Sequence, residues 1–237
     1  LLVAGPIERA THLLPQVEKP RVFNYSKAVD GLRQILWGLF KKVVVADNCA
    51  ELANTIFNNH QHYSGSTLVL GAMLFAIQIY GDFSGYSDIA LGTARLLGFE
   101  LLQNFRFPYF SRDIAEFWRR WHISLSSWFT DYVFIPLGGS RNGTWNSYQN
   151  IFITMLLSGL WHGAAYTFIL WGVFHGLLLI VERLGFARVL GRSPRLLRHV
   201  YAMGAVMVGW VLFRADDLGQ ALAFYRAMAG QSAADQA

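Results

Sequence analysis

The longest stretch without charge constrains the fold of this chain most. Residues 142–181 contain no Asp, Glu, Lys or Arg, and residues 151–181 are almost entirely apolar. A helix over 151–181 would be roughly 46 Å long at about 1.5 Å per residue, whereas the hydrocarbon core of a bilayer is about 30 Å thick. The stretch must therefore break. We expect the break between Ser158 and Gly163, with a short helix that ends near Ser158 and a full membrane span over 164–181.

The composition indicates the same class of protein. Hydrophobic residues make up 54% of the chain and charged residues 15%, and the mean hydropathy is +0.30. An ordinary globular domain has about 25% charged residues. Too few charges remain to cover a water-soluble surface, so the sequence predicts an all-α, polytopic integral membrane protein. The single Cys49 excludes an internal disulfide.

Further apolar stretches give the expected layout. Residues 52–81 are free of charge, residues 199–213 form a short apolar run, and 28–46 form another candidate interrupted by Lys41 and Lys42. The long stems of these two lysines can reach an interface while their ammonium groups stay in water.

The basic residues predict the orientation. Between Arg183 and Arg198 the chain has five arginines and no acid. We expect this segment to be a cytoplasmic loop, since short basic loops face the cytoplasm. The same pattern explains the net charge of +5 without nucleic-acid binding. We expect residues 231–237 to form a solvated tail.

Residues 113–132 show an amphipathic pattern. Treated as one helix at about 100° per residue, the segment has its large apolar residues within about 60° of Ile114, opposite Glu116 and Asp131. We expect this helix to lie flat at an interface or in a re-entrant position, ended by the Pro and glycines of 136–139. His122 falls at the border of the two faces, where one ring nitrogen can contact protein and the other a ligand. The apolar face contains Ile114, Phe117, Trp118, Trp121, Leu125, Trp128, Phe129 and Tyr132.

Two further segments place ionisable groups among apolar residues. His162 lies between small residues within an apolar run, and an ionisable residue at membrane depth is a functional candidate by default. His175 follows thirteen residues later, about 140° away on a straight helix, so pairing with His162 has no support from periodicity. Asp82 and Asp88 end an apolar stretch in which glycines at 81 and 85 allow an irregular backbone.

Several motifs in this order carry a resemblance. The chain contains FWRRWHISLS at 117–126, YVFIPLGGSR at 132–141, GLWHG at 159–163, VAGPI at 3–7, DFSGYSD at 82–88 and LFRAD at 212–216. Together they resemble the membrane-bound O-acyltransferase family, above all its bacterial alginate O-acetyltransferase-like branch.

The resemblance implies a ring of transmembrane helices around a funnel or tunnel. The family's catalytic histidine corresponds to His162 and its second motif histidine to His122. Because the family proteins are longer, we expect 1–237 to be a single membrane domain, with N-terminal spans and part of the C-terminal region outside it. The expected location is the bacterial inner membrane.

The chemistry follows from that resemblance. Acyl transfer to an alcohol needs a base, and a neutral imidazole suits this near pH 7. We assign His162 as general base and His122 as the residue that orients a substrate. Expected substrate-binding residues are Trp118, Trp121, Trp161, Arg119, Arg120, Asp82 and His175.

No bound cofactor or metal is expected, since the chain has no HExxH or CxxC spacing. The expected donor is an acyl thioester, either acetyl-CoA or an acyl carrier protein. The expected partners are the lipid bilayer and an exported polysaccharide or a periplasmic transferase.

Each assignment has a structural alternative. His162, His122 and His175 could be packing histidines, Asp82 and Asp88 could pair with an arginine such as Arg95 or cap a helix, and the tryptophans could form an interfacial belt. Arg119 and Arg120 could face lipid headgroups. At the level of function, one alternative is a transporter or export-channel subunit with a His and Asp relay, and another is D-alanyl transfer to teichoic acid.

The orientation is testable by cysteine labelling. In a Cys49→Ser background, Ser193→Cys should resist a membrane-impermeant maleimide in intact cells, because the basic segment faces the cytoplasm. It should react after the cells are permeabilised. Labelling of intact cells would contradict the cytoplasmic assignment.

Overall fold

A computed structural model describes residues 5–231, which contain helices and connecting segments but no strand. This confirms the all-α prediction. The expected tail over 231–237 lies outside the described residues except for Gln231. The α-helices are α1 (Ala10–Glu18), α2 (Tyr25–Leu39), α3 (Asp47–Asn58), α4 (Gly65–Leu96), α5 (Ile114–Trp118), α6 (Ile123–Phe129), α7 (Thr144–His162), α8 (Tyr166–Val181), α9 (Ala187–Arg192), α10 (Arg195–Arg214) and α11 (Leu218–Arg226).

Shorter π- and 3-10-helical segments join several of these helices. They are η1 (Phe40–Ala46), η2 (His60–His62), η3 (Pro108–Phe110), η4 (Thr130–Phe134), η5 (Glu182–Phe186) and η6 (Ala227–Gln231). Among the described residues, three helical runs are long and apolar enough to cross a membrane, namely Gly65–Leu96, Tyr166–Arg192 and Arg195–Arg214. The run 28–46, an expected further span, is not among them.

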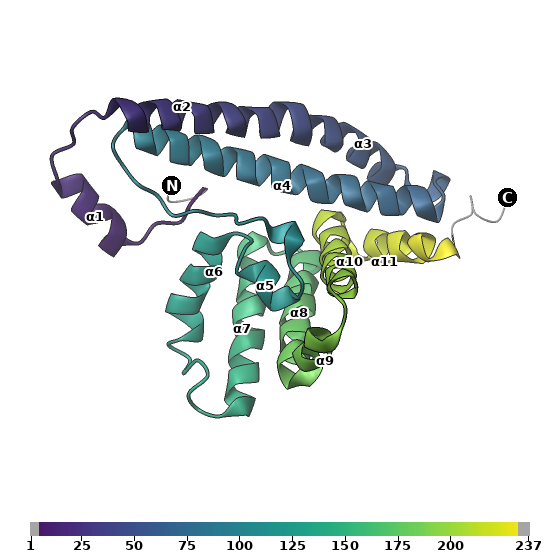
Figure 1. The fold of residues 1–237 in the computed structure, drawn as a ribbon. Coiled ribbons are helices and arrows are strands. Elements are labelled where there is room, and N and C mark those ends of the chain that lie inside the picture. The colour runs from purple at the N-terminus through teal and green to yellow at the C-terminus, as the bar shows by residue number, and fades with distance from the viewer. Residues whose placement is uncertain (1–4, 232–237) are drawn as a thin grey trace.

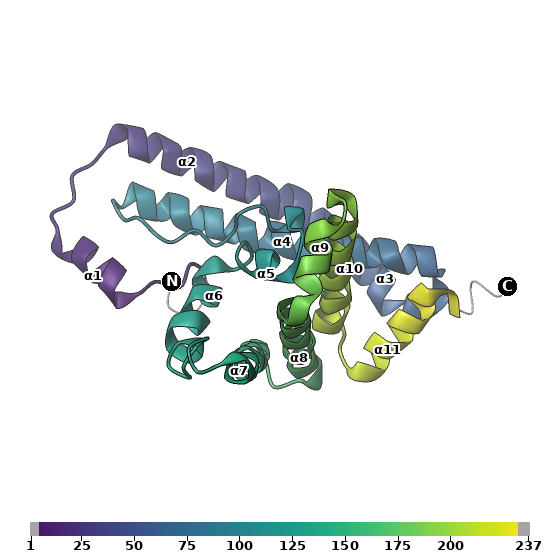
Figure 2. The same ribbon diagram turned by 60° about the horizontal axis from the view of Figure 1, so that its bottom comes forward.

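The helices form two groups (Figure 1). The first is a long antiparallel pair, in which α2 continues through η1 into α3 beside α4. The second is the pair α7 and α8, which projects away from α4, with α6 beside α7. Helix α10 packs on both α8 and α4 and so connects the two groups (Figure 2).

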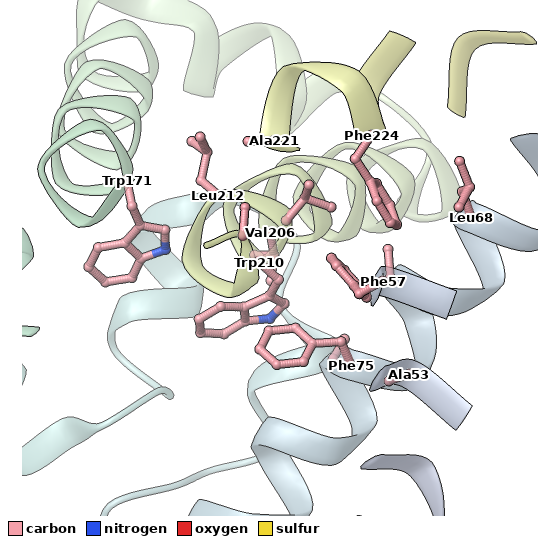
Figure 3. Close-up of a cluster of buried hydrophobic side chains, with 14 of the residues drawn as sticks. Ala53, Phe57, Leu68, Phe75, Trp171, Val206, Trp210, Leu212, Ala221 and Phe224 are labelled. Atoms are coloured by element: carbon pink, nitrogen blue, oxygen red, sulfur yellow. The ribbon is translucent and has the colours of Figure 1, made fainter. Parts of the chain in front are cut away.

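A buried apolar cluster joins α3, α4, α8, α10 and α11 (Figure 3). Phe57 of α3 stacks on Phe224 of α11, with ring centroids 4.3 Å apart. Trp210 of α10 and Trp171 of α8 extend this cluster towards the second group. The C-terminal helices therefore fix how the α7–α8 pair sits relative to α4.

Glycines allow the closest helix contacts. On α4, a Cβ at Gly85 would lie 2.7 Å from the carbonyl oxygen of Gly38 on α2. Between α7 and α8, a Cβ at Gly172 would collide with the carbonyl oxygen of Met155 and lie 3.2 Å from the Cα of Gly159. Small residues at such crossings let backbones pack directly, which supplies contact energy in lipid, where the hydrophobic effect does not drive association.

The predicted break in 151–181 exists at Gly163, within the expected range, but the helix before it ends at His162 and not near Ser158. Helix α7 continues through Ser158 and Gly159 to His162, and the chain turns at Gly163, whose φ is 157°. A Cβ at Gly163 would lie 2.8 Å from the Phe168 ring, so a side chain here would be strained and would clash. Gly159 is therefore a packing residue rather than a helix breaker.

The single amphipathic helix expected over 113–132 is wrong. The segment consists of α5 and α6 separated by a turn at His122, whose φ of 43° is left-handed. Residues 104–106 run alongside this turn: Arg106 N–H donates to the Arg120 carbonyl at 3.0 Å, and Ile123 N–H donates to the Asn104 carbonyl at 2.9 Å. These long-range bonds replace the helical ones, which sequence periodicity cannot reveal.

Two further expectations are corrected. The backbone at Gly81 and Gly85 is regular helix within α4, and both glycines are buried against the segment that contains Gly38 and Lys41. The expected basic loop is largely helical, because η5, α9 and the start of α10 leave only residues 193–194 outside helices.

The α7–α8 crossing is testable by overpacking. Gly172→Ala would press a methyl group onto the Met155 carbonyl, and overpacking of this kind costs about 1–3 kcal/mol. The thermal unfolding midpoint of the full-length protein in detergent should therefore fall. Gly204→Ala is the matched control, since a Cβ there has no atom within 4 Å. Equal midpoints for the two variants would contradict the role of this crossing.

Candidate active site

His162 is the last residue of α7, at the turn into α8. Its Nδ1 lies 2.7 Å from the carbonyl oxygen of Ser158, one turn earlier. A carbonyl oxygen only accepts hydrogen bonds, so Nδ1 carries the proton and donates it. The other nitrogen, Nε2, is therefore left with a free lone pair. This geometry fixes the tautomer that a general base requires.

His122 approaches from the opposite direction, at the turn before α6. Its side chain is only 5% exposed, and neither ring nitrogen has a hydrogen-bond partner among the described residues. The ring packs edge-on against Phe83 of α4, with centroids 4.5 Å apart. A buried imidazole without partners on a left-handed backbone is a costly arrangement, and such strain is typical of functional sites.

The two histidines line one cavity of 290 Å³. Trp161 lies next to both rings: its ring centroid is 6.1 Å from that of His122 and 4.9 Å from that of His162. The walls are mainly aromatic, and no acidic side chain lines them, so nothing in the cavity favours charged imidazoles over neutral ones. The cavity is lined by Gly5, Ile7, Ile79, Phe83, Trp118, Trp121, His122, Leu125, Trp161, His162, Trp171, Trp210 and Phe213.

Three indole groups of this lining, those of Trp118, Trp171 and Trp210, have buried Nε1 donors without a partner among the described residues. An unpaired buried donor is unfavourable by about 1–3 kcal/mol. The Trp171 donor faces α10, since a Cβ at Gly209 would lie 3.5 Å from it, so these donors belong to the packed wall and not to the cavity surface.

A larger cavity of 640 Å³ adjoins the first, because Trp118 and Leu125 line both. Its other walls come from α5, α6, α7, α8 and η5, and they include Arg119 and Arg183 together with Ser158. Asp113 and Glu182 line it too, so a long substrate in this cavity would pass both cations and acids, with the histidine cavity at its end.

Glu182 is a residue of this region that motif reasoning missed. Its side chain is buried at the end of α8, where it accepts hydrogen bonds from the backbone N–H groups of Ile114 at 2.7 Å and Ala115 at 3.0 Å, and from the Tyr201 hydroxyl at 3.1 Å. It thereby holds the N-terminus of α5, which a five-residue helix cannot do alone. The sequence could have indicated this residue, because Glu182 is the only acid between residues 132 and 215.

Other predicted site residues lie elsewhere. Arg119 reaches the larger cavity, but Arg120 pairs with Glu116 at 2.6 Å. His175 is buried behind the cavity wall, with its ring 5.1 Å from both Trp118 and Trp171. It lines neither cavity.

The acids of the 82–88 segment have structural partners. Asp82 pairs with Lys42 at 2.6 Å, and Asp88 pairs with Lys41 and accepts a hydrogen bond from Gln34 at 2.9 Å. Their partners are thus lysines of η1 and not Arg95. Within residues 5–231, no group of three His, Cys, Asp or Glu side chains is arranged to hold a metal ion.

Comparison with known proteins identifies relatives of the whole chain. It is 45% identical to the probable alginate O-acetylase AlgI of Azotobacter vinelandii over 96% of this chain and 45% of that protein. It is 37% identical to the peptidoglycan O-acetyltransferase of Helicobacter pylori over 97% of this chain and 44% of that protein. A teichoic acid D-alanyltransferase of Streptococcus thermophilus is 41% identical over 48% of this chain and 29% of that protein.

The chain spans about half the length of the curated relatives it matches. The sequence profile of MBOAT, the membrane-bound O-acyltransferase family, matches residues 1–215. Because this match covers nearly the whole chain and the relatives agree with it, the chain belongs to the membrane-bound O-acyltransferase family.

Proposed function

We propose that this chain forms the catalytic part of a multi-pass inner-membrane O-acyltransferase, which transfers an acetyl-type group from a cytoplasmic thioester to a hydroxyl group. The observation that carries the proposal is the His162 tautomer. Its Nδ1–H is bonded to Ser158, so its Nε2 lone pair is free in a cavity that it shares with the unpartnered His122.

The proposed reaction proceeds through a tetrahedral intermediate. Nε2 of His162 accepts the proton of the acceptor hydroxyl while the alcohol oxygen bonds to the thioester carbonyl carbon. The intermediate collapses by cleavage of the C–S bond, and the leaving thiolate takes the proton back from Nε2. His122 lines the same cavity and is the residue proposed to orient the carbonyl.

The larger cavity is the proposed donor side. Acetyl-CoA and an acyl carrier protein both present a long phosphate-bearing arm that ends in a thioester. Arg119 and Arg183 line the cavity and suit the phosphates, and the cavity adjoins the histidines through Trp118 and Leu125. The arginine-rich segment that includes Arg183 is the expected cytoplasmic side.

The acceptor class is proposed from the relatives. Their names describe acetylation of alginate and peptidoglycan, so an exported polysaccharide, or a periplasmic transferase that passes the group on, is the proposed acceptor. D-alanyl transfer to teichoic acid has weaker support, because the relatives with that name match 48% of this chain at 41% identity or 74% of it at 29% identity.

A transport function is the second candidate. The adjoining cavities around His122 and His162 would also suit a transporter or export-channel subunit in which the histidines relay protons. In that case no acyl donor would bind.

The base assignment is testable with His162→Ala in the full-length protein. Removal of a general base should lower acyl transfer by about 10²-fold or more. The measurement is release of free thiol from acetyl-CoA together with acetylation of the polysaccharide. His62→Ala, which changes an exposed histidine, is the matched control and should retain activity. Acylation at the wild-type level by a normally expressed His162→Ala protein would overturn the assignment.

Donor binding separates the enzyme from the transporter. Acetyl-CoA should raise the thermal unfolding midpoint of the full-length protein more than free coenzyme A does, because only the thioester also contacts the histidine cavity. The same measurement identifies the donor when it is repeated with acetyl-acyl carrier protein and D-alanyl-acyl carrier protein. Each is compared with its free carrier, and the donor is the thioester that raises the unfolding midpoint most. The absence of stabilisation by every thioester would favour the transport function.

A further inference from the structure

A third hollow, of 450 Å³, also adjoins the histidine cavity. Ile79, Phe83 and Phe213 line both spaces, whereas the third hollow shares no lining residue with the larger arginine-lined cavity. The histidine cavity is therefore bordered by two separate hollows. This arrangement gives two substrates separate approaches to the same pair of imidazoles.

The two hollows differ in charge. Arg119 and Arg183 line the first together with Asp113 and Glu182, whereas the third has no cationic side chain and one acid, Asp82. A phosphate-bearing donor therefore has no electrostatic reason to enter the third hollow. Its polar lining residues are Gln78, Asp82 and Tyr86, which repeat every four residues and so share one stripe of α4.

Gln78 is the member of this stripe with unused hydrogen-bonding capacity. Asp82 is paired with Lys42, and Tyr86 is 46% exposed. The Gln78 amide makes no hydrogen bond within the described part of the chain, and its Oε1 atom is closed off from solvent. An unpaired amide in the middle of a candidate membrane span is unfavourable unless a ligand completes its hydrogen bonds.

An amide suits an alcohol as ligand. The NH₂ group of Gln78, unlike its Oε1 atom, is not closed off, and it can donate a hydrogen bond to a hydroxyl oxygen of a polyol. Being uncharged, it adds no charge beside the neutral imidazoles. The neighbouring Ile79 borders the histidine cavity, so a polyol held at Gln78 would lie in a hollow that adjoins that cavity.

We propose that Gln78 is an acceptor-binding residue, which hydrogen-bonds the hydroxyl groups of a polyol acceptor in the third hollow and orients one of them towards His162. This inference rests on the proposed acyl transfer and adds the place and chemistry of acceptor binding. Gln78 takes no part in the proton transfer itself.

The test uses Gln78→Met in the full-length protein, because Met keeps the length of the side chain but removes the amide. Acetyl-CoA is the donor, and an alginate oligosaccharide is the acceptor. The KM for the oligosaccharide should rise about fivefold or more, as for one lost hydrogen bond between uncharged groups. The KM for acetyl-CoA and the slow hydrolysis of acetyl-CoA without acceptor should stay unchanged.

Two further variants complete the design. Ile77→Met introduces the same side chain one residue earlier, outside the hollow. It should leave the KM for the oligosaccharide, the KM for acetyl-CoA and the rate of acetyl-CoA hydrolysis unchanged. Gln78→Asn keeps the amide but shortens the side chain, so its acceptor KM should lie between those of the wild type and Gln78→Met. If Gln78→Met does not fold, the test rests on Gln78→Asn: a raised KM for the oligosaccharide supports the role of Gln78, and a wild-type KM overturns it.

The outcomes separate the two levels of inference. If Gln78→Met leaves the KM for the oligosaccharide unchanged, or changes the KM for acetyl-CoA equally, the role of Gln78 is overturned. Acyl transfer remains supported in that case if the release of thiol from acetyl-CoA depends on His162. If wild type and His162→Ala release thiol from acetyl-CoA equally, the proposed function itself fails.

Discussion

The direct backbone contact of α7 with α8 at Gly159 and Gly172 is the interaction on which the rest of the site depends. Because neither residue has a side chain, the two helices approach until backbone meets backbone. This brings the C-terminal end of α7, which carries His162, against Trp171 of α8, with ring centroids 5.0 Å apart. In a lipid environment such contact supplies the packing energy that water exclusion supplies elsewhere.

A second set of contacts brings His122 to the same place. The turn that carries it is held by backbone bonds to residues 104–106, while Glu182 holds the N-terminus of α5. The two histidines thus come from two interruptions of helical structure, one at Gly163 and one at His122 itself.

Much of this arrangement could be anticipated from the sequence, although not in detail. The charge-free stretches predicted the all-α membrane architecture, and the motifs indicated that His162, His122 and the three tryptophans belong together; the structure places all five around one cavity. The straight helix over 113–132 was wrong because periodicity reports a local preference, whereas the turn depends on partners around residue 104. The lysine partners of Asp82 and Asp88 were missed for the same reason, since they lie more than 35 residues earlier.

What the sequence determined by itself is the class of the molecule and the chemistry of its residues. A chain with 54% hydrophobic and 15% charged residues must bury its backbone in helices, and its few histidines in apolar runs mark where chemistry is possible. The tertiary structure alone decided which nitrogen of His162 is free, which hollows meet at the two imidazoles and that Gln78 stands unpaired beside them. These properties depend on contacts between helices far apart in the chain, and hydropathy and spacing contain no information about such contacts.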